Sequence, residues 1–335
     1  MSSPQTTNLF HSKTNNVVIL GGAGFLGLHI AHQLTQNNQR VILLDSSSRI
    51  KQIPQGLLNH NCLKKVIEYP YSDASAVAPS LDQGDVLIHL GWSQVPNDNR
   101  QSYQKDITEN LAFTAALFDL AIDIGVSKVV FASSGGSVYG NSSKSPLTEG
   151  CPTEPISSYG IAKLASEKYL NLLSRGTATL PVVLRIGNAY GLHLAPNLTP
   201  TGLIPFFISA LKQNITVNIW GDGEVVRDFI HVRDIAAAFC AAIEATTLNG
   251  TFNIGTGIGT SINQLIGLIE ENLGKTAQIT NSRGRSCDVK EAVLDASEFR
   301  RLTQWSPLIN LKQGVNEIIQ QKPSTETKHG TQYSN

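Results

Sequence analysis

Paired cysteines, net charge and long apolar runs are all missing from this chain, and each absence excludes a class of protein. The four cysteines, Cys62, Cys151, Cys240 and Cys287, lie far apart and form no Cys-x-x-Cys pair. A disulfide framework or structural zinc site is therefore not expected, and we predict no bound metal. Basic and acidic residues both number 26, so the basic excess typical of a nucleic-acid-binding protein is absent. No stretch approaches the ~18 apolar residues of a membrane-spanning helix.

The remaining composition is that of an ordinary soluble protein. Of the 335 residues, 41% are hydrophobic and 16% charged, which is enough apolar material for a sizeable core. Residues 1–15 are polar and contain no apolar segment behind a basic start, so we expect no secretory signal and a cytoplasmic location. Because 1–15 and 321–335 lack apolar periodicity, we expect both to be disordered tails.

The first half alternates short apolar, β-branched runs with longer amphipathic stretches. We predict strands at 17–20, 41–44, 86–90, 129–132 and 182–186, with helices at 25–37, 105–124 and 158–174. A further strand at 65–68 and a short helix at 74–81 are weaker predictions. Continuous apolar strands separated by helices predict an α/β fold, with a doubly wound (Rossmann) parallel sheet and helices on both faces.

The pattern changes after about residue 190. Pro196, Pro200 and Pro205 interrupt the chain, and residues 221–223 read Gly-Asp-Gly, as in a tight turn. We predict helices at 202–213, 234–246, 261–273 and 311–320. Residues 16–190 are therefore expected to form the main domain. Residues 191–320 would form mainly a smaller substrate-side lobe, with segments such as 251–254 returning to the main sheet.

A glycine-rich loop follows the first predicted strand. Residues 21–27 read Gly-Gly-Ala-Gly-Phe-Leu-Gly, which satisfies Gly-x-Gly-x-x-Gly through Gly22, Gly24 and Gly27. Gly21, Gly24 and Gly27 also fit the wider Gly-x-x-Gly-x-x-Gly spacing. Such glycines permit a tight turn and close approach of a pyrophosphate, which the free N–H groups at Phe25 and Leu26 would then receive. The alternative is a purely structural turn.

An acidic residue ends the second predicted strand. Asp45 lies 24 residues after Gly21, where a carboxylate would accept the hydroxyls of an adenosine ribose. The same carboxylate would repel a 2′-phosphate, so we predict NAD rather than NADP as cofactor. Arg49 is the one nearby residue that favours the opposite choice.

Tyr159 and Lys163 stand four residues apart, about one helical turn, on one face of a predicted helix. A free tyrosine has a pKa of ~10, and a neighbouring positive charge favours its phenolate. Such a tyrosine can accept a hydroxyl proton while hydride leaves the same carbon. By itself the pair could equally be a tyrosine and a surface lysine at helical spacing.

In order and spacing, these segments resemble the extended short-chain dehydrogenase/reductase family in its nucleotide-sugar branch, most closely the UDP-hexose 4-epimerases. The resemblance covers about residues 16–320. It is carried by the glycine loop, Asp45, Asn110, the Tyr159–Lys163 couple, and the segments 85–91, 133–140, 185–191 and 220–234.

The resemblance implies a role for each matching residue. Tyr159 would be the acid/base, Lys163 would orient it and contact the nicotinamide ribose, and Asn110 would support both. Leu90 and Gly91 would contact the cofactor. Asn188 would contact the sugar nucleotide, and two arginines, Arg227 and Arg285, would bind its diphosphate as paired donors. The alternative for each arginine is a surface ion pair.

Three departures from the family pattern stand out. The usual catalytic Ser or Thr position is Gly135 here, so we expect Ser134 to supply the hydroxyl, with Ser133 or Ser137 as alternatives. Gly91-Trp92 replaces a pair of small residues and would reshape the nicotinamide pocket. An aspartate that contacts adenine has no clear counterpart, and Asp73 is only a weak candidate.

The residues directly before the Val-Tyr-Gly turn limit the choice of reaction. Dehydratases and Glu-dependent decarboxylases of the family usually carry a carboxylate there, whereas residues 135–137 read Gly-Gly-Ser. We therefore expect an epimerase that oxidises C4 transiently and returns hydride to the opposite face. The alternatives are an NDP-4-ketosugar reductase with exchangeable cofactor and a non-catalytic NAD-binding protein.

Two further expectations concern substrate size and assembly. Aligning Arg285–Asp288 with the family's Arg-x-Gly-Asp pattern places Ala292 where some relatives carry a bulky gate. Alanine would leave room for an N-acetyl group, so UDP-GlcNAc is expected beside UDP-Glc, unless Ala292 faces away from the pocket. Relatives dimerise through the helices at 105–124 and 158–174. The apolar positions there fit a homodimer or the core equally, namely Leu111, Ala115, Leu117, Leu164 and Leu170.

Overall fold

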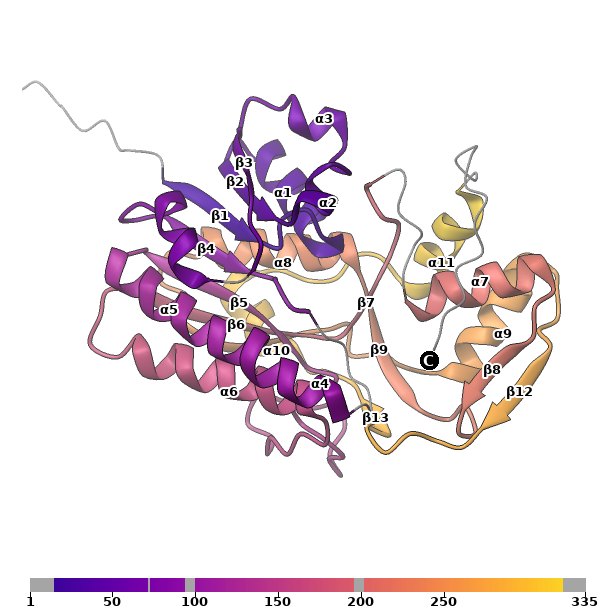
Figure 1. Cartoon of the computed structure of the whole chain (residues 1–335). Helices are drawn as coiled ribbons and strands as arrows, with labels where there is room; N and C mark the ends of the chain where they lie inside the picture. Colours follow the sequence, from indigo (N-terminus) through magenta and orange to yellow (C-terminus); the bar gives the residue numbers. More distant parts are fainter. Residues whose placement is uncertain (1–14, 72, 94–99, 196–201, 322–335) are drawn as a thin grey trace, which may run out of the picture.

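The computed structural model describes residues 15–71, 73–93, 100–195 and 202–321. Its centre is a seven-stranded sheet in the order β10-β6-β5-β4-β1-β2-β3, in which every strand is parallel to its neighbours (Figure 1). The strands are β1 (Asn16–Leu20), β2 (Arg40–Asp45), β3 (Leu63–Glu68), β4 (Val86–His89), β5 (Lys128–Ser134), β6 (Leu180–Ile186) and β10 (Gly250–Ile254). This is the predicted doubly wound sheet.

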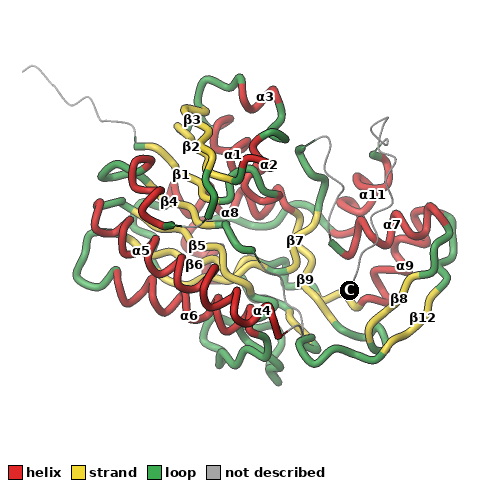
Figure 2. The backbone as a smooth tube through the Cα atoms, viewed as in Figure 1, coloured by secondary structure: helices red, strands yellow, loops and turns green. Residues whose placement is uncertain are grey.

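Both faces of the sheet are covered, which explains why its strands read as continuous apolar runs. Successive side chains of a strand point to opposite faces, so Val17 and Ile19 join one core cluster while Val18 and Leu20 join the other. The first cluster packs against α1 (Phe25–Gln36), α8 (Val232–Glu244) and α10 (Ser297–Thr303). The second packs against η1 (Ala74–Ser80), α5 (Ala112–Ile124) and α6 (Ser158–Leu173). Figure 2 shows helices flanking the yellow strands.

The second half of the chain also forms a smaller region with short strands of its own. β9 (Val226–His231) pairs with β7 (Asn188–Tyr190), β11 (Gly259–Ser261) and β13 (Glu291–Ala292), while β8 (Val217–Trp220) pairs with β12 (Ile279–Ser282). A separate apolar cluster joins these strands to α7 (Leu203–Gln213), α9 (Ile262–Leu273) and α11 (Leu311–Gln320). The four helices predicted for this half correspond to α7, α8, α9 and α11. The predicted return of 251–254 to the main sheet is β10, an edge strand.

The helix predicted at 105–124 differs from the prediction at its beginning. Helical structure begins at Arg100 with α4 (Arg100–Lys105), continues through a π-helical segment, η2 (Asp106–Leu111), and only then becomes α5. Two one-turn helices, α2 (Ser47–Ile50) and α3 (Gln55–Leu58), follow β2. The predicted tails, apart from Asn15 and Gln321, lie outside the described residues, as do Pro196 and Pro200. The boundary predicted at residue 190 falls at the end of β7.

Candidate functional site

The glycine loop connects β1 to α1 by a turn that only glycine can make at two positions. Gly21 has a φ of +84°, in the left-handed region where a side chain is strained. A Cβ on Gly27 would lie 2.7 Å from Cα of Gly22, so glycine there lets the helix approach the loop. The α1 N-terminus has no side-chain cap and no acid in its first turn. Its free N–H groups, at Phe25 and Leu26 among others, therefore suit an anion such as a pyrophosphate.

Asp45 ends β2 and is almost completely buried, at 1% exposure. Its two carboxylate oxygens accept hydrogen bonds from the backbone N–H groups of Ala23, at 3.0 Å, and Ser46, at 2.8 Å. Burial raises the pKa of this carboxyl, while Ser46, Arg49 and a hydrogen bond from Tyr71 oppose the rise. The carboxylate is thus fixed beside the glycine loop, where a ribose could meet it. Asp73, the weak adenine candidate, instead accepts two hydrogen bonds from Ser75 and caps η1.

The loop after β4 passes directly over the glycine loop. The N–H of Leu90 donates to the carbonyl of Leu20 at 2.9 Å, and a Cβ on Gly21 would lie 2.8 Å from the nitrogen of Gly91. β1 and β4 are neighbours in the sheet, and the strand order runs in opposite directions on the two sides of this pair. Doubly wound sheets bind ligands at the carboxyl end of such a pair. The next residue, Trp92, packs toward β5 and α6. The centroid of its ring lies 6.2 Å from that of Phe131 and 6.0 Å from that of Tyr159.

Tyr159 occupies the first turn of α6, which Ser157 caps by accepting from the N–H of Gly160. Burial raises the pKa of Tyr159 to about 12; a hydrogen bond with Ser134 opposes the rise, and the charge of Asp106 adds to it. Burial thus moves this pKa in the direction opposite to the one expected from a positive neighbour. In the chain alone, Tyr159 is a protonated phenol at neutral pH.

The structure separates the three candidate serines. Ser134, at the end of β5, is the one that shares a hydrogen bond with Tyr159. The Ser133 hydroxyl donates to Glu167 on α6, and the backbone N–H of Ser137 donates to the carbonyl of Ser134. At the position of the family's usual hydroxyl, a Cβ on Gly135 would lie 2.8 Å from Leu294 Cδ2. A side chain at 135 would therefore collide with Leu294, whereas the hydroxyl of the preceding residue, Ser134, lies beside Tyr159.

Lys163 is buried, at 4% exposure, one turn beyond Tyr159. Its ammonium donates to the carbonyl of Ala132 at 2.8 Å and lies 5.8 Å from the centroid of the Tyr159 ring. Burial lowers the pKa of Lys163 to about 7, and the charges of Glu167 and Asp106 oppose the decrease. The predicted couple is therefore a buried phenol beside an ammonium whose charge changes near neutral pH.

Asn110 lies in the π-helical segment η2 and is buried. Its Oδ1 accepts from the backbone N–H of Ser93 at 3.0 Å and from the Ser93 hydroxyl at 3.2 Å. Its Nδ2 donates to Asp106 at 3.4 Å. Burial raises the pKa of Asp106, and hydrogen bonds from Ser158 and Asn110 oppose the rise. Asn110 thus joins the loop after β4 to η2, and Asp106 joins η2 to the beginning of α6.

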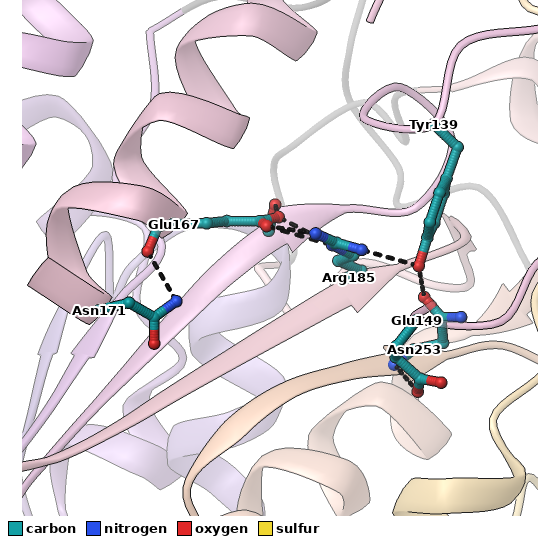
Figure 3. A network of polar contacts seen from close by, with 7 residues as sticks. Tyr139, Glu149, Glu167, Asn171, Arg185 and Asn253 are labelled. Carbon is teal, nitrogen blue, oxygen red and sulfur yellow. Dashed lines mark hydrogen bonds and ion pairs between the residues drawn. The ribbon is translucent and has the colours of Figure 1, made fainter. Parts of the chain in front are cut away.

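A buried polar network extends from Glu167, on the same helix as Tyr159 and Lys163, to β6 and β10 (Figure 3). Glu167 forms an ion pair with Arg185 on β6, with Nη2 and Oε2 2.6 Å apart. Arg185 also donates to the Tyr139 hydroxyl at 2.9 Å, which in turn donates to Asn253 Oδ1 on β10 at 2.7 Å. Because Ser133 donates to the same Glu167 carboxylate, the network joins α6, β5, β6 and β10.

The predicted substrate residues lie on the second region of the fold. Asn188 begins β7, and a Cβ on Gly136 would lie 3.4 Å from its Oδ1 and 4.0 Å from Ser134 Oγ, so Asn188 and Ser134 flank the same glycine. Arg227 lies opposite Ala292 in the β9–β13 pair. Its Nη1 donates to the carbonyls of Val226 and Val289. Ala292 is 3% exposed.

Arg285 forms an ion pair with Asp288 at 2.8 Å, and its guanidinium carbon lies 5.9 Å from the Trp220 ring centroid. This ion pair corresponds to the alternative considered for Arg285. Burial lowers the pKa of Arg227; the charge of Asp288 opposes the decrease, and that of Arg285 adds to it. Two guanidinium groups that repel each other in this way suit a doubly charged anion such as a diphosphate.

Sequence reasoning missed Asp106 and Glu167. Glu167 continues the spacing of Tyr159 and Lys163 by four residues, and Asp106 precedes Asn110 by four. This helical spacing was the available signal. Among the described residues no cluster of three or more His, Cys, Asp or Glu side chains could hold a metal ion. In the same part of the chain, no helix combines the length and apolar character needed to cross a membrane.

A comparison with sequence families agrees with this geometry. The sequence model of the NAD dependent epimerase/dehydratase family matches residues 17–255, a span that includes the glycine loop, Asp45, Ser134, Tyr159 and Lys163. This chain belongs to that family. NAD is accordingly its cofactor, and the residues around the glycine loop and Asp45 fit it.

Relatives in this epimerase/dehydratase family extend over almost the whole chain. A putative UDP-glucose 4-epimerase of Methanocaldococcus jannaschii is 31% identical, covering 90% of this chain and 97% of the relative. A dTDP-4-dehydro-6-deoxyglucose reductase of Escherichia coli is 29% identical, with 92% and 98% covered. The crystal structure of UDP-glucose 4-epimerase from Thermotoga maritima with UDP-glucose superposes with a TM-score of 0.79 at 32% identity, covering 91% and 97%. The relatives thus include both epimerases and a reductase.

Proposed function

We propose that this chain is an NAD-dependent nucleotide-sugar 4-epimerase acting on UDP-hexoses. The observation that carries the proposal is the convergence of Ser134, Tyr159 and Lys163 at the end of β5. There Ser134 hydrogen-bonds to the phenol and the Lys163 ammonium is anchored one turn away. This arrangement is suited to moving a proton on and off a sugar hydroxyl. The likeness to UDP-glucose 4-epimerases over about 90% of the chain supports the same conclusion.

The residues divide the proposed reaction among themselves. NAD, when bound, supplies a hydride acceptor that later becomes the donor. Tyr159 removes the proton of the C4 hydroxyl and later returns it, and Ser134 holds the same oxygen by its hydroxyl. Because burial leaves the pKa of Tyr159 at about 12, the tyrosine becomes a base only when positive charge near it stabilises the phenolate. The charged form of Lys163 supplies part of that charge.

An epimerase needs no additional acid near C5 and C6, and the residues directly after β5 offer none. Residues 135–137 contain no carboxylate. The two carboxylates behind the couple are engaged elsewhere: Glu167 pairs with Arg185, and Asp106 bonds to Ser158 and Asn110. We therefore infer that the dehydratase and decarboxylase reactions of the wider family are not carried out here.

We further propose that the substrate pocket accepts an N-acetyl group at C2. Asn188 would contact the sugar nucleotide, and Arg227 with Arg285 would bind its diphosphate. Ala292, which pairs with Arg227, would leave space beside the sugar. Replacing Ala292 by Tyr should abolish turnover of UDP-GlcNAc before that of UDP-Glc. Equal loss of both substrates would contradict this role.

A ketosugar reductase is the second candidate function. It is favoured by the 29% identity to the dTDP-4-dehydro-6-deoxyglucose reductase of Escherichia coli, which covers 92% of this chain. The two functions differ in what happens to the cofactor. An epimerase regenerates NAD in each cycle, whereas a reductase consumes added NADH or NADPH.

The deciding experiment is product analysis by NMR with no cofactor added. Purified protein is incubated separately with UDP-Glc, UDP-GlcNAc and UDP-glucuronate. A C4 epimer in any tube supports the epimerase and shows that NAD stays bound. Three unchanged substrates, together with NAD detected in the protein, would refute the UDP-hexose epimerase. The reductase is then tested by NADH consumption with a dTDP-4-ketosugar.

We also propose that the protein forms a homodimer through the helices α4, η2 and α6. Of the five apolar residues first considered, Leu117 and Leu170 are buried in the core of the same chain, while Leu111, Ala115 and Leu164 are half-buried. Other side chains are exposed on these helices, namely Tyr103, Ile107, Ile161, Tyr169 and Leu172, at 44–58% exposure. Light scattering at micromolar concentration should give twice the chain mass of 36.1 kDa. A monomer there would contradict the dimer.

A further inference from the structure

A tryptophan covers the ammonium of the catalytic couple. Trp92 follows Gly91 in the loop after β4, and Lys163 Nζ lies 3.8 Å from the centroid of its ring. The same ring packs edge-on against Tyr159, with centroids 6.0 Å apart and an interplanar angle of 79°. Phe131 on β5 forms another side of this enclosure, 4.8 Å from Nζ. Lys163 is thus surrounded by three aromatic rings.

Few hydrogen-bond acceptors or negative charges lie close enough to the Lys163 ammonium to offset the cost of burying its charge. Its hydrogen bond to the carbonyl of Ala132 satisfies one of three donors. Among the described residues no carboxylate oxygen lies within 4.0 Å of Nζ. The charged or titratable groups that face it are Glu167, Asp106, His89 and Tyr159. The first two favour the ammonium from a distance, and His89 is buried and neutral, because burial lowers its pKa to about 3.

The face of the Trp92 ring supplies the close electrostatic attraction that these groups do not provide. A ring carries negative charge on its face, attracts a cation within about 6 Å of its centroid, and does so most strongly for tryptophan and for a desolvated cation. We propose that Trp92 is a positioning residue that acts through Lys163. Its ring keeps the buried ammonium charged and holds it against the end of β5, beside Tyr159. The proposal rests on the proposed function in one respect, since the catalytic use of the charge is that of Lys163 in the epimerase.

The chain contains a matched control for this effect. In the described part of the chain, Lys128, at the beginning of β5, is the other buried lysine with a lowered pKa, to about 8. Its ammonium donates to the carbonyls of Ala242 and Ala245, at 2.6 and 2.7 Å. No ring lies over it among the described residues. A change confined to the aromatic enclosure should therefore alter the titration of Lys163 and leave that of Lys128 unchanged.

The test is an NMR titration of the protein labelled with ¹³C at the lysine ε-carbons, with no nucleotide sugar present. Lys163→Arg and Lys128→Arg assign the two signals. Trp92→Leu keeps an apolar side chain but removes the ring, so the midpoint of Lys163 should fall by about one pH unit, equivalent to ~1.4 kcal/mol. The direction follows from the charge: the ring favours the ammonium, so its loss favours the neutral amine. Trp92→Phe retains a ring face and should keep most of the wild-type midpoint.

Two results would overturn the proposal. One is an equal shift in Trp92→Leu and Trp92→Phe, which would assign the effect to burial alone. The other is an upward shift in Trp92→Leu, which would mean that water entering the space stabilises the ammonium better than the ring does. If the Lys128 midpoint also moves, the fold has changed, and Trp92→Met, whose longer and more flexible apolar side chain adapts better to the space, decides by the same comparison with Trp92→Phe.

A kinetic readout links the contact to catalysis. As pH rises through the midpoint of Lys163, the ammonium loses its proton and ceases to favour the phenolate of Tyr159. In the pH profile of kcat, the alkaline limb should therefore shift to lower pH by about one unit in Trp92→Leu. In Trp92→Phe it should stay near its wild-type position. An unmoved limb in Trp92→Leu, despite a shifted NMR midpoint, would refute the catalytic part. If wild-type protein turns over no nucleotide sugar, the proposed function fails, while the NMR titration still decides the contact.

Discussion

The buried pair between Glu167 and Arg185 gives a quantitative prediction about stability (Figure 3). Glu167 is 2% exposed and Arg185 6%. Arg185 donates to both carboxylate oxygens through Nε, at 3.0 and 3.2 Å, and through Nη2, at 2.6 Å. Replacing Glu167 by Gln leaves a guanidinium without its counter-charge in a nearly dry site. Such a change should lower the free energy of unfolding by about 3–5 kcal/mol.

The assay is urea unfolding at pH 7, with two companion variants. Glu167→Leu combined with Arg185→Met removes both charges of the pair and should cost less than Glu167→Gln alone, because the guanidinium is removed together with its counter-charge. Glu298→Gln breaks an exposed pair of the same bidentate geometry with Arg301 and should change stability little, since water replaces the lost contact. The reasoning fails if Glu167→Gln is as mild as Glu298→Gln, or if the double variant is as unstable as the single one.

The remaining predictions concern the couple and the glycine loop. Tyr159→Phe should lower kcat by about 10²–10⁴-fold with NAD binding by calorimetry unchanged; retained turnover would exclude Tyr159 as the acid/base. Ser134→Ala should lower kcat, whereas Ser133→Ala should mainly lower the urea midpoint because it removes a donor to the Glu167 pair; the reverse assignment would contradict the observed contacts. Gly27→Ala should weaken NAD binding and stability, since its Cβ would lie 2.7 Å from the loop backbone. Gly267→Ala, in open space on α9, should instead stabilise by about 0.5–1 kcal/mol, and similar effects of both would refute the steric argument.

The sheet could be predicted because its strands are buried on both faces. Runs such as Val17–Leu20 and Val129–Ala132 are apolar throughout, and the helices between them have a clear amphipathic period. The short strands of the second region carry no such signal. β7, β11 and β13 are two or three residues long, and their pairing with β9 depends on contacts between distant parts of the chain. Length and alternation could not reveal them.

The site was predictable where spacing on one element decides it. Tyr159 and Lys163 are one helical turn apart, and the glycine loop and Asp45 follow their strands directly. Which serine meets Tyr159 depended instead on Leu294, far along the chain, which fills the space beside Gly135. The downward shift of the pKa of Lys163 likewise depends on burial by several elements, which the sequence of α6 does not encode.

The position of β10 has a consequence for how the protein is made. β6 pairs with β5 on one side and with β10 on the other, yet about 60 residues separate β6 from β10 along the chain. During synthesis, the edge of β6 stays unpaired until residue 254 has left the ribosome. The hydrogen bonds that link Arg185 and Tyr139 to Asn253 can be completed only at the same stage. A chain shortened to residue 190 would expose that edge permanently, which invites pairing with other copies. The sheet formed by the first half of the chain is thus completed only by a strand from the second half.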